Sequence, residues 1–145
     1  MGDSGLLTFE LSQLGAENVN PLNVAKAALE MQKEFNKIRE GWENLGWPVE
    51  RVYSRIGIES GYIKQEIVGH PSKREIAVFG DAVNVASILC RAADRTKDAI
   101  YIGEKFYEQI SKYKFIDVAE IAIEKRKREK DLITKPYELR DIKEW

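Results

Sequence analysis

The polar residues that could carry chemistry in this sequence follow Gly80 and Gly2. Gly80 and Asp81 come directly after the apolar run Glu75–Phe79, and Asn84 lies three residues further on. We predict that a helix begins at Gly80-Asp81, because small and acidic residues are typical of helix starts. A helix start can bind phosphate through its free backbone N–H groups, which makes Gly80 and Asp81 candidate phosphate-binding residues. The simpler interpretation is that Asp81 is the N-cap of this helix and that Asn84 is a structural polar contact.

Three other side chains have weaker patterns around them. Asp3 follows the other glycine, Gly2, and is a candidate metal ligand, but one carboxylate near a chain end is a poor site for Mg²⁺. His70, the only histidine, lies in a Gly-His-Pro turn without cysteine or histidine neighbours, so we expect no metal site there. Cys90, the only cysteine, excludes an internal disulfide and is expected to pack in a helix.

The elements in the first half of the chain that would position these residues are a helix and several strands. Leu6–Leu11 predicts an opening strand, and a stripe of apolar residues at steps of three and four, entered at Pro21, predicts a long helix that ends before Gly46. Arg51–Gly61 predicts a strand, with Tyr62–Val68 as its hairpin partner.

The second half of the chain continues the mixture of strands and helices. In chain order the predicted elements are a strand at Glu75–Phe79, a helix to about Asp94, a buried strand at Ala99–Ile102, a helix at Gly103–Ile110, and strands near Phe115–Ile123 and Leu132–Leu139. Hairpins mixed with helices indicate an α+β fold, and residues 1–145 are expected to form a single domain.

Composition excludes several classes of protein. The 145 residues carry 23 Lys and Arg against 24 Asp and Glu, so a globally basic nucleic-acid binder is not expected. The charged stretch Glu124–Lys130 is interpreted as a solvated hairpin tip. The apolar runs are too short to cross a membrane and the start lacks signal-peptide features, so the sequence predicts a cytoplasmic protein without a membrane partner.

Two motifs occur in a definite order. Arg55–Gly61, followed by Gly69, comes first, and Val78–Ser87 comes second. Together they resemble the class III adenylate/guanylate cyclase catalytic domain, in which an R-I-G-I strand precedes a G-D-x-V-N-x-A helix. The resemblance covers nearly the whole chain. It implies a ferredoxin-like α+β fold whose first strand and first helices would lie before Met1.

The resemblance also implies a reaction. In this family the 3′-hydroxyl of ATP or GTP attacks the α-phosphorus, which closes a cyclic nucleotide and expels pyrophosphate. Two aspartates hold Mg²⁺ or Mn²⁺ ions, an asparagine orients the ribose, and an arginine stabilises charge on the phosphate. Carried over residue by residue, Asn84 matches the asparagine, Asp3 one metal-binding aspartate, and Lys130 a phosphate-facing lysine. Because the family site lies between two subunits, the resemblance implies a homodimer or a heterodimer with another cyclase-like chain.

Two positions depart from the family pattern. Ala77 stands where the family has the Asp or Thr that reads the base, and a methyl group cannot form a hydrogen bond. Ile88 stands where the family has its arginine, four residues after Asn84 and on the same helix face. Losing one such charge-stabilising group costs about 10²–10³-fold in rate. Arg91 lies roughly 4–5 Å further along the helix, and we interpret it as a surface residue.

These departures predict a degenerate nucleotidyl cyclase-like domain that is not an active enzyme and acts by dimerisation or nucleotide sensing in signalling. The alternative is an adenylate or guanylate cyclase that is weakly active, or that forms one half of a heterodimer. ATP or GTP is the expected ligand in both cases. Mg²⁺ or Mn²⁺ is expected as a cofactor only if the domain is active.

Overall fold

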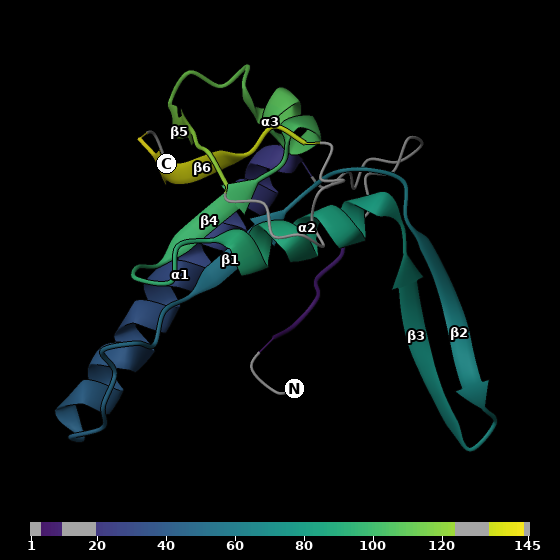
Figure 1. Cartoon of the computed structure of the whole chain (residues 1–145), viewed down its shortest axis with the longest axis horizontal. Helices are drawn as coiled ribbons and strands as arrows, with labels where there is room; N and C mark the ends of the chain where they lie inside the picture. The colour runs from purple at the N-terminus through teal and green to yellow at the C-terminus, as the bar shows by residue number, and fades with distance from the viewer. Residues whose placement is uncertain (1–3, 10–19, 124–133, 144–145) are drawn as a thin grey trace.

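The computed structural model describes residues 4–9, 20–123 and 134–143, which fold into a mixture of helices and strands (Figure 1). In chain order the elements are α1 (Pro21–Asn44), β1 (Arg55–Ile58), β2 (Lys64–His70), β3 (Lys73–Phe79), α2 (Asp81–Ala92), β4 (Ala99–Ile102), α3 (Glu104–Ile110), β5 (Ile116–Glu120) and β6 (Tyr137–Ile142). Four strands form a sheet in the order β1-β4-β6-β5, and β2 and β3 form a separate two-stranded sheet. The predicted α+β fold class is confirmed.

Helix α1 begins and ends where the sequence predicts. The side chain of Asn20 caps it by accepting a hydrogen bond from the backbone N–H of Leu22 at 3.0 Å, and Pro21 is its first residue. The helix ends at Asn44, and Gly46 follows with a φ of 80°. Capping by Asn20 and termination near Gly46 therefore fix a 24-residue helix.

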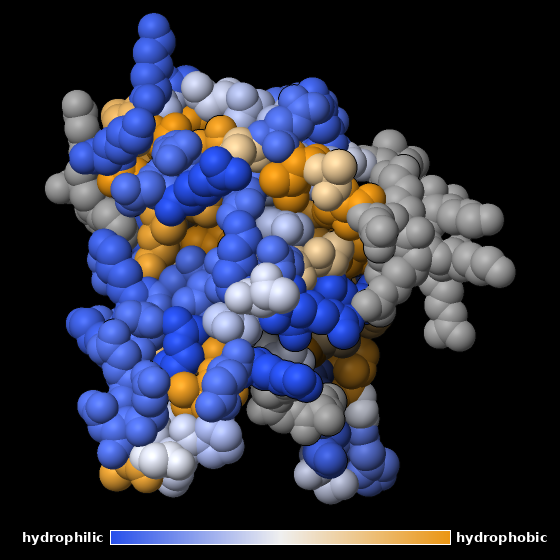
Figure 2. Space-filling model, turned by 60° about the vertical axis from the view of Figure 1, so that its left-hand side comes forward, coloured by the Kyte–Doolittle hydropathy of each residue, from blue (hydrophilic) through white to orange (hydrophobic). Residues whose placement is uncertain are grey.

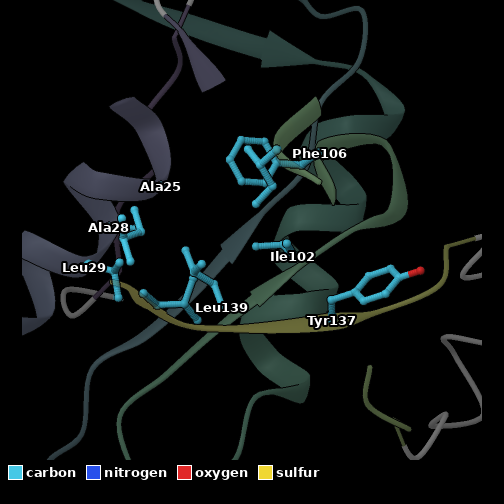
Figure 3. Packing of buried hydrophobic residues seen from close by; sticks show 10 residues of the cluster. Ala25, Ala28, Leu29, Ile102, Phe106, Tyr137 and Leu139 are labelled. Atoms are coloured by element: carbon cyan, nitrogen blue, oxygen red, sulfur yellow. The ribbon is translucent and has the colours of Figure 1, made fainter. Parts of the chain in front are cut away.

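Strand β4 lies at the centre of the sheet and separates two apolar clusters. Ile100 and Ile102 belong to the larger cluster, with buried residues of α1, α3 and β6 (Figure 3). Ala99 and Tyr101 belong to the second cluster, with Leu89 of α2. Because successive side chains of a strand point to opposite faces, α1 with α3 covers one face of the sheet and α2 covers the other.

Strand β1 pairs with β4 in parallel and brings α2 close to the sheet. The register runs from Arg55 opposite Ala99 to Ile58 opposite Ile102. A Cβ atom on Gly57 would collide with the backbone carbonyl of Ala86 in α2. Glycine at this position therefore lets α2 pack directly on the backbone of β1.

The predicted hairpin between β1 and β2 is wrong. Strand β2 pairs with β3 in antiparallel register, from Lys64 opposite Phe79 to His70 opposite Lys73. The tight turn after His70 makes this pairing local, whereas β1 is paired in the sheet with β4, more than forty residues away in sequence. The β2–β3 hairpin projects from the rest of the molecule, and most of its residues are exposed (Figure 1).

The two ends of the chain also differ from the prediction. No helix or strand forms in residues 4–9, so the predicted opening strand is wrong over this part, and its remainder lies outside the described residues. Thr8 accepts a hydrogen bond from the side chain of Gln65 at 3.3 Å. The last strand runs from Tyr137 to Ile142, later than predicted, and the predicted tip at Glu124–Lys130 lies outside the described residues. Among the described residues, no helix is long and apolar enough to cross a membrane.

Candidate functional site

The candidate site lies where β3 passes into α2. Gly80 joins the two elements with a φ of 148°, a backbone conformation that residues with a side chain rarely adopt. A Cβ atom at Gly80 would also lie only 2.5 Å from the carbonyl oxygen of Tyr62. Glycine is therefore required at this junction, which fixes the direction in which α2 leaves the hairpin.

Asp81 is not the N-cap that the sequence predicted. The N-cap of α2 is Gly80, which has no side chain to accept a hydrogen bond, and Asp81 is the first helical residue. Because only glycine readily adopts this backbone conformation, Gly80 is the cap. The helix therefore starts one residue earlier than it would with Asp81 as the cap. The exposed carboxylate of Asp81 still lies in the first turn, where a negative charge favours the positive end of the helix dipole.

Asn84 lies in the first turns of α2 and is exposed. Its backbone N–H donates to the carbonyl oxygen of Gly80 at 3.3 Å, which belongs to the start of the helix. Its side-chain amide forms no hydrogen bond with the described residues, so it is not held as a structural contact by that part of the chain.

Ile88 lies one turn after Asn84 on the same face of α2. The helix is continuous from Asp81 to Ala92, so the spacing of four residues read from the sequence holds in the structure. The side chain of Ile88 is half-buried. Arg91 is exposed and donates to the hydroxyl oxygen of Ser87 at 3.3 Å. The guanidinium of Arg91 thus reaches back one turn along α2 to Ser87, the residue before Ile88.

Ala77 lies in β3 directly opposite Glu66 of β2. Cross-strand partners share one face of a two-stranded sheet, so the carboxylate of Glu66 is the polar group across from the Ala77 methyl. Glu66 forms an ion pair with Lys64 of its own strand at 2.6 Å. Ala77 is therefore an apolar residue with a charged pair across the hairpin.

An open groove with a volume of about 430 Å³ lies beside the start of α2. Its lining residues are Ser60, Gly61, Tyr62, Lys105, Glu108 and Gln109. The hydroxyl of Ser60 donates to the side-chain oxygen of Gln109 at 2.6 Å, and Gly61 packs closely on Ala82 of α2. No signal in the sequence predicts this groove, because the fold joins segments that lie more than forty residues apart.

Glu59, next to this groove, acts as a cap for α3. One of its carboxylate oxygens accepts hydrogen bonds from the backbone N–H groups of Ser60 at 2.9 Å and Phe106 at 3.0 Å. The other accepts from the hydroxyl of Thr134 at 3.2 Å. Through these hydrogen bonds Glu59 holds the start of α3 and the segment beside the groove in place.

The predicted candidates Asp3 and Lys130 both lie outside the described residues. Over residues 4–9, 20–123 and 134–143, no three His, Cys, Asp or Glu side chains form a group that could hold a metal ion. His70 shares a hydrogen bond with the hydroxyl of Ser72 at 2.9 Å, and the thiol of Cys90 donates to the carbonyl of Arg55 at 3.3 Å. The structure therefore brings Gly80, Asp81 and Asn84 together and leaves the metal-binding predictions open.

Comparison with known families identifies the domain. The family model described as the Adenylate and Guanylate cyclase catalytic domain matches residues 1–135. The chain belongs to this family. Asn84, Ala77 and Ile88 can therefore be compared with the asparagine, base reader and arginine of the cyclase pattern.

Solved structures of cyclases share the fold. The chain is similar to the crystal structure of the adenylyl cyclase CyaB from P. aeruginosa, with a TM-score of 0.63 and 23% identity over 90% of this chain and 63% of that chain. It is also similar to the guanylate cyclase domain of RhGC from Catenaria anguillulae in complex with GTP, with a TM-score of 0.56 and 17% identity over 93% of this chain and 73% of that chain. The chain thus spans less than two thirds of the CyaB chain. A comparison with curated proteins gives no match.

Proposed function

We propose that this cyclase-family domain does not catalyse nucleotide cyclisation and acts by dimerisation or nucleotide sensing in signalling. The observation that carries the proposal is the side chain of Ile88. It lies one turn after Asn84 on a continuous helix, and by the resemblance this position matches the family's arginine. Arg91, the other candidate on α2, stands three residues later and is engaged with Ser87, so we do not assign it the role of that arginine.

The chemistry explains why this replacement matters. As the 3′-oxygen of a nucleotide attacks the α-phosphorus, negative charge grows on the phosphate oxygens. A guanidinium placed there in advance stabilises that charge, and removing one such group costs about 10²–10³-fold in rate. Ile88 offers only methyl and methylene groups. Ala77 adds a second deficit, because it can neither donate to nor accept from a purine edge.

Two features at the start of α2 support nucleotide sensing: the side chain of Asn84 and the backbone N–H groups of the first helical residues. The exposed amide of Asn84 can donate to and accept from a ribose hydroxyl. The backbone N–H groups of Asp81 and Ala82 precede the first hydrogen bonds of α2, which Val83 and Asn84 donate to Gly80, and N–H groups at a helix start suit a phosphate oxygen. The described residues do not bring together the carboxylates that Mg²⁺ or Mn²⁺ prefers, so the proposal assigns no step to a metal ion.

Titration calorimetry with ATP and GTP tests this proposal on the wild-type chain and on two variants of α2. Asn84→Ala removes the ribose-facing amide, and Ser87→Ala is the matched control, because it is an exposed neighbour in the same helix. We expect binding by the wild-type chain, binding about fivefold weaker in Asn84→Ala, as loss of about one neutral hydrogen bond implies, and unchanged binding in Ser87→Ala. Chromatography of the recovered samples should show intact nucleotide.

Two results would change this conclusion. Cyclic nucleotide in the wild-type sample that is absent with Asn84→Ala would show that the domain is an active cyclase. If ATP and GTP do not bind at millimolar concentration, nucleotide sensing is ruled out and dimerisation remains as the proposed role.

A second candidate function is half of a heterodimeric cyclase. It is favoured by Asn84, whose exposed amide keeps the family's ribose-orienting group while the arginine position is lost. A partner chain would then supply the missing groups. Mixing the two chains should produce activity that neither shows alone, and Asn84→Ala should abolish that activity.

A further inference from the structure

The groove beside the start of α2 has two walls that hydrogen bonds tie together. One wall is the segment Ser60–Tyr62 after β1, and the other is the exposed side of α3. The hydroxyl of Ser60 donates to the side chain of Gln109 in α3 at 2.6 Å. The carboxylate of Glu59 adds a second tie, because it accepts from the backbone N–H groups of both Ser60 and Phe106. The groove is therefore a fixed feature of the fold.

Two charges of opposite sign lie along the α3 wall of the groove. Lys105 and Glu108 are exposed, and their spacing of three residues places them on the same side of the helix. Phe106 and Ile110 of the same helix are buried in the core. In the part of the chain that the structure describes, the side chains of Lys105 and Glu108 form no ion pair and no hydrogen bond. The groove lining therefore carries one ammonium and one carboxylate, with a net charge of zero.

The opposite wall carries an aromatic ring. The side chain of Tyr62 is 95% exposed, more than any other large hydrophobic side chain of the described residues. The backbone of Tyr62 is held close to Gly80, since a Cβ atom there would lie 2.5 Å from the Tyr62 carbonyl oxygen. The molecular surface in Figure 2 likewise places hydrophobic patches among hydrophilic side chains. An exposed ring beside two opposite charges suits a ligand with a flat apolar part and a charged part.

We propose that this groove binds a free α-amino acid with an aromatic side chain. The ammonium of Lys105 pairs with the carboxylate of the ligand, and the carboxylate of Glu108 pairs with its ammonium group. The aromatic ring of the ligand packs against the ring of Tyr62. The groove volume of about 430 Å³ lies within the range of about 300–1,000 Å³ that is typical of small-ligand pockets.

Charge complementarity favours a zwitterion over other small molecules. A nucleotide carries several negative charges, and the carboxylate of Glu108 repels them. An uncharged apolar ligand would cover Lys105 and Glu108 without pairing either of them, which costs free energy. An amino acid pairs both charges at once and leaves its side chain for the ring of Tyr62.

The groove is separate from the ligand contacts proposed at the start of α2. Ala82 packs on Gly61 beside the groove. The exposed side chain of Asn84 comes two residues later and therefore lies on nearly the opposite side of the helix. Binding of an amino acid in the groove does not depend on the proposed nucleotide binding, so either proposal can fail without the other.

Chemical-shift titration of the full chain by NMR, with L-phenylalanine up to about 20 mM, tests the proposal. We expect the backbone signals of the groove residues to shift with a Kd of about 1 mM, because the groove is open and its ion pairs are exposed. Lys105→Gln and Glu108→Gln should each weaken binding about two- to fivefold, and Tyr62→Ala about tenfold. Lys112→Gln and Glu104→Gln remove exposed charges outside the groove. These two matched controls should bind like the wild-type chain.

Two analogues of the ligand test each charge separately, with a result that a merely destabilised variant would not give. 3-Phenylpropionate lacks the ammonium group, so it should bind Glu108→Gln more tightly than the wild-type chain, because the repelling carboxylate is gone. Phenethylamine lacks the carboxylate and should bind Lys105→Gln more tightly than the wild-type chain. The proposal would be overturned by unshifted groove signals at about 20 mM phenylalanine, by analogue affinities that the two variants do not change, or by displacement of phenylalanine by ATP.

Discussion

A half-buried ion pair joins α1 to the start of β4. The guanidinium of Arg39 donates to both carboxylate oxygens of Asp98, at 2.8 and 2.9 Å. The same carboxylate accepts from the backbone N–H of Ser54 at 2.8 Å. The side chains of Arg39 and Asp98 are only 16% and 23% exposed. One carboxylate therefore links α1, the segment before β1 and the segment before β4.

We predict that Asp98→Asn lowers the free energy of unfolding by about 2–3 kcal/mol. Removing one partner of a fully buried pair costs about 3–5 kcal/mol, and an exposed pair is worth about 0–1 kcal/mol. The exposed fractions of 16% and 23% place this pair between those limits and closer to the buried one. Asparagine keeps the shape of aspartate and one acceptor oxygen. The change therefore removes the negative charge and one of the two oxygens that accept from Arg39, without opening a cavity.

The pH dependence of stability gives an independent check. Burial raises the pKa of Asp98, but the hydrogen bonds from Arg39 and Ser54 and the charge of Arg39 outweigh burial and hold the pKa below its ordinary value of 3.8. A carboxyl whose pKa is lowered by folding stabilises the protein above its ordinary pKa, and this contribution is lost as the pH falls through the folded pKa. The difference between the wild-type chain and Asp98→Asn should therefore be constant near neutral pH and shrink below about pH 4.

Urea unfolding followed by circular dichroism measures both effects. Lys37→Gln is the control, because the exposed Lys37–Glu34 pair should contribute no more than about 0.5 kcal/mol. The double variant Arg39→Met, Asp98→Asn should lose less than the sum of the two single changes. A loss below about 0.5 kcal/mol for Asp98→Asn, or a loss that stays the same at low pH, would refute this account of the pair.

Two further changes test how the fold positions α2 and α1. Gly57→Val should destabilise the chain by more than about 3 kcal/mol, because the valine side chain would collide with the Ala86 carbonyl and push α2 off β1. Thermal unfolding measures this loss, and a variant as stable as the wild-type chain would contradict it. Asn20→Ala should cost about 1 kcal/mol through the lost cap to Leu22, measured by urea unfolding, with Asn20→Ser expected to recover most of the loss.

Local patterns predicted the helices better than the strand pairing. The apolar stripe, Pro21 and Gly46 were sufficient for α1, because caps and periodicity act within a few residues. The order of the sheet depends on contacts between distant segments. Strand β1 pairs with β4 rather than with the nearby β2, and nothing in the sequence of Arg55–Ile58 specifies that partner.

In the candidate site, too, local features could be predicted from the sequence and contacts between distant segments could not. The relation between Asn84 and Ile88 could be predicted, because a continuous helix turns a spacing of four residues into one shared face. The helix start at Gly80-Asp81 could be predicted, but the N-cap was assigned to Asp81 instead of Gly80, since the sequence does not show the φ of 148° at Gly80. The groove lined by Ser60 and Gln109 could not be predicted, because only the folded chain brings β1's end to α3.

The most direct test of the central claim is a single-turnover assay with the wild-type chain in excess over labelled ATP or GTP and with Mn²⁺ present. Under these conditions even slow cyclisation accumulates product. The absence of an arginine at the position of Ile88 predicts that the nucleotide is recovered unconverted. Formation of cyclic nucleotide and pyrophosphate in equal amounts, abolished by Asn84→Ala and retained by Ser87→Ala, would contradict the claim and establish the domain as an active cyclase.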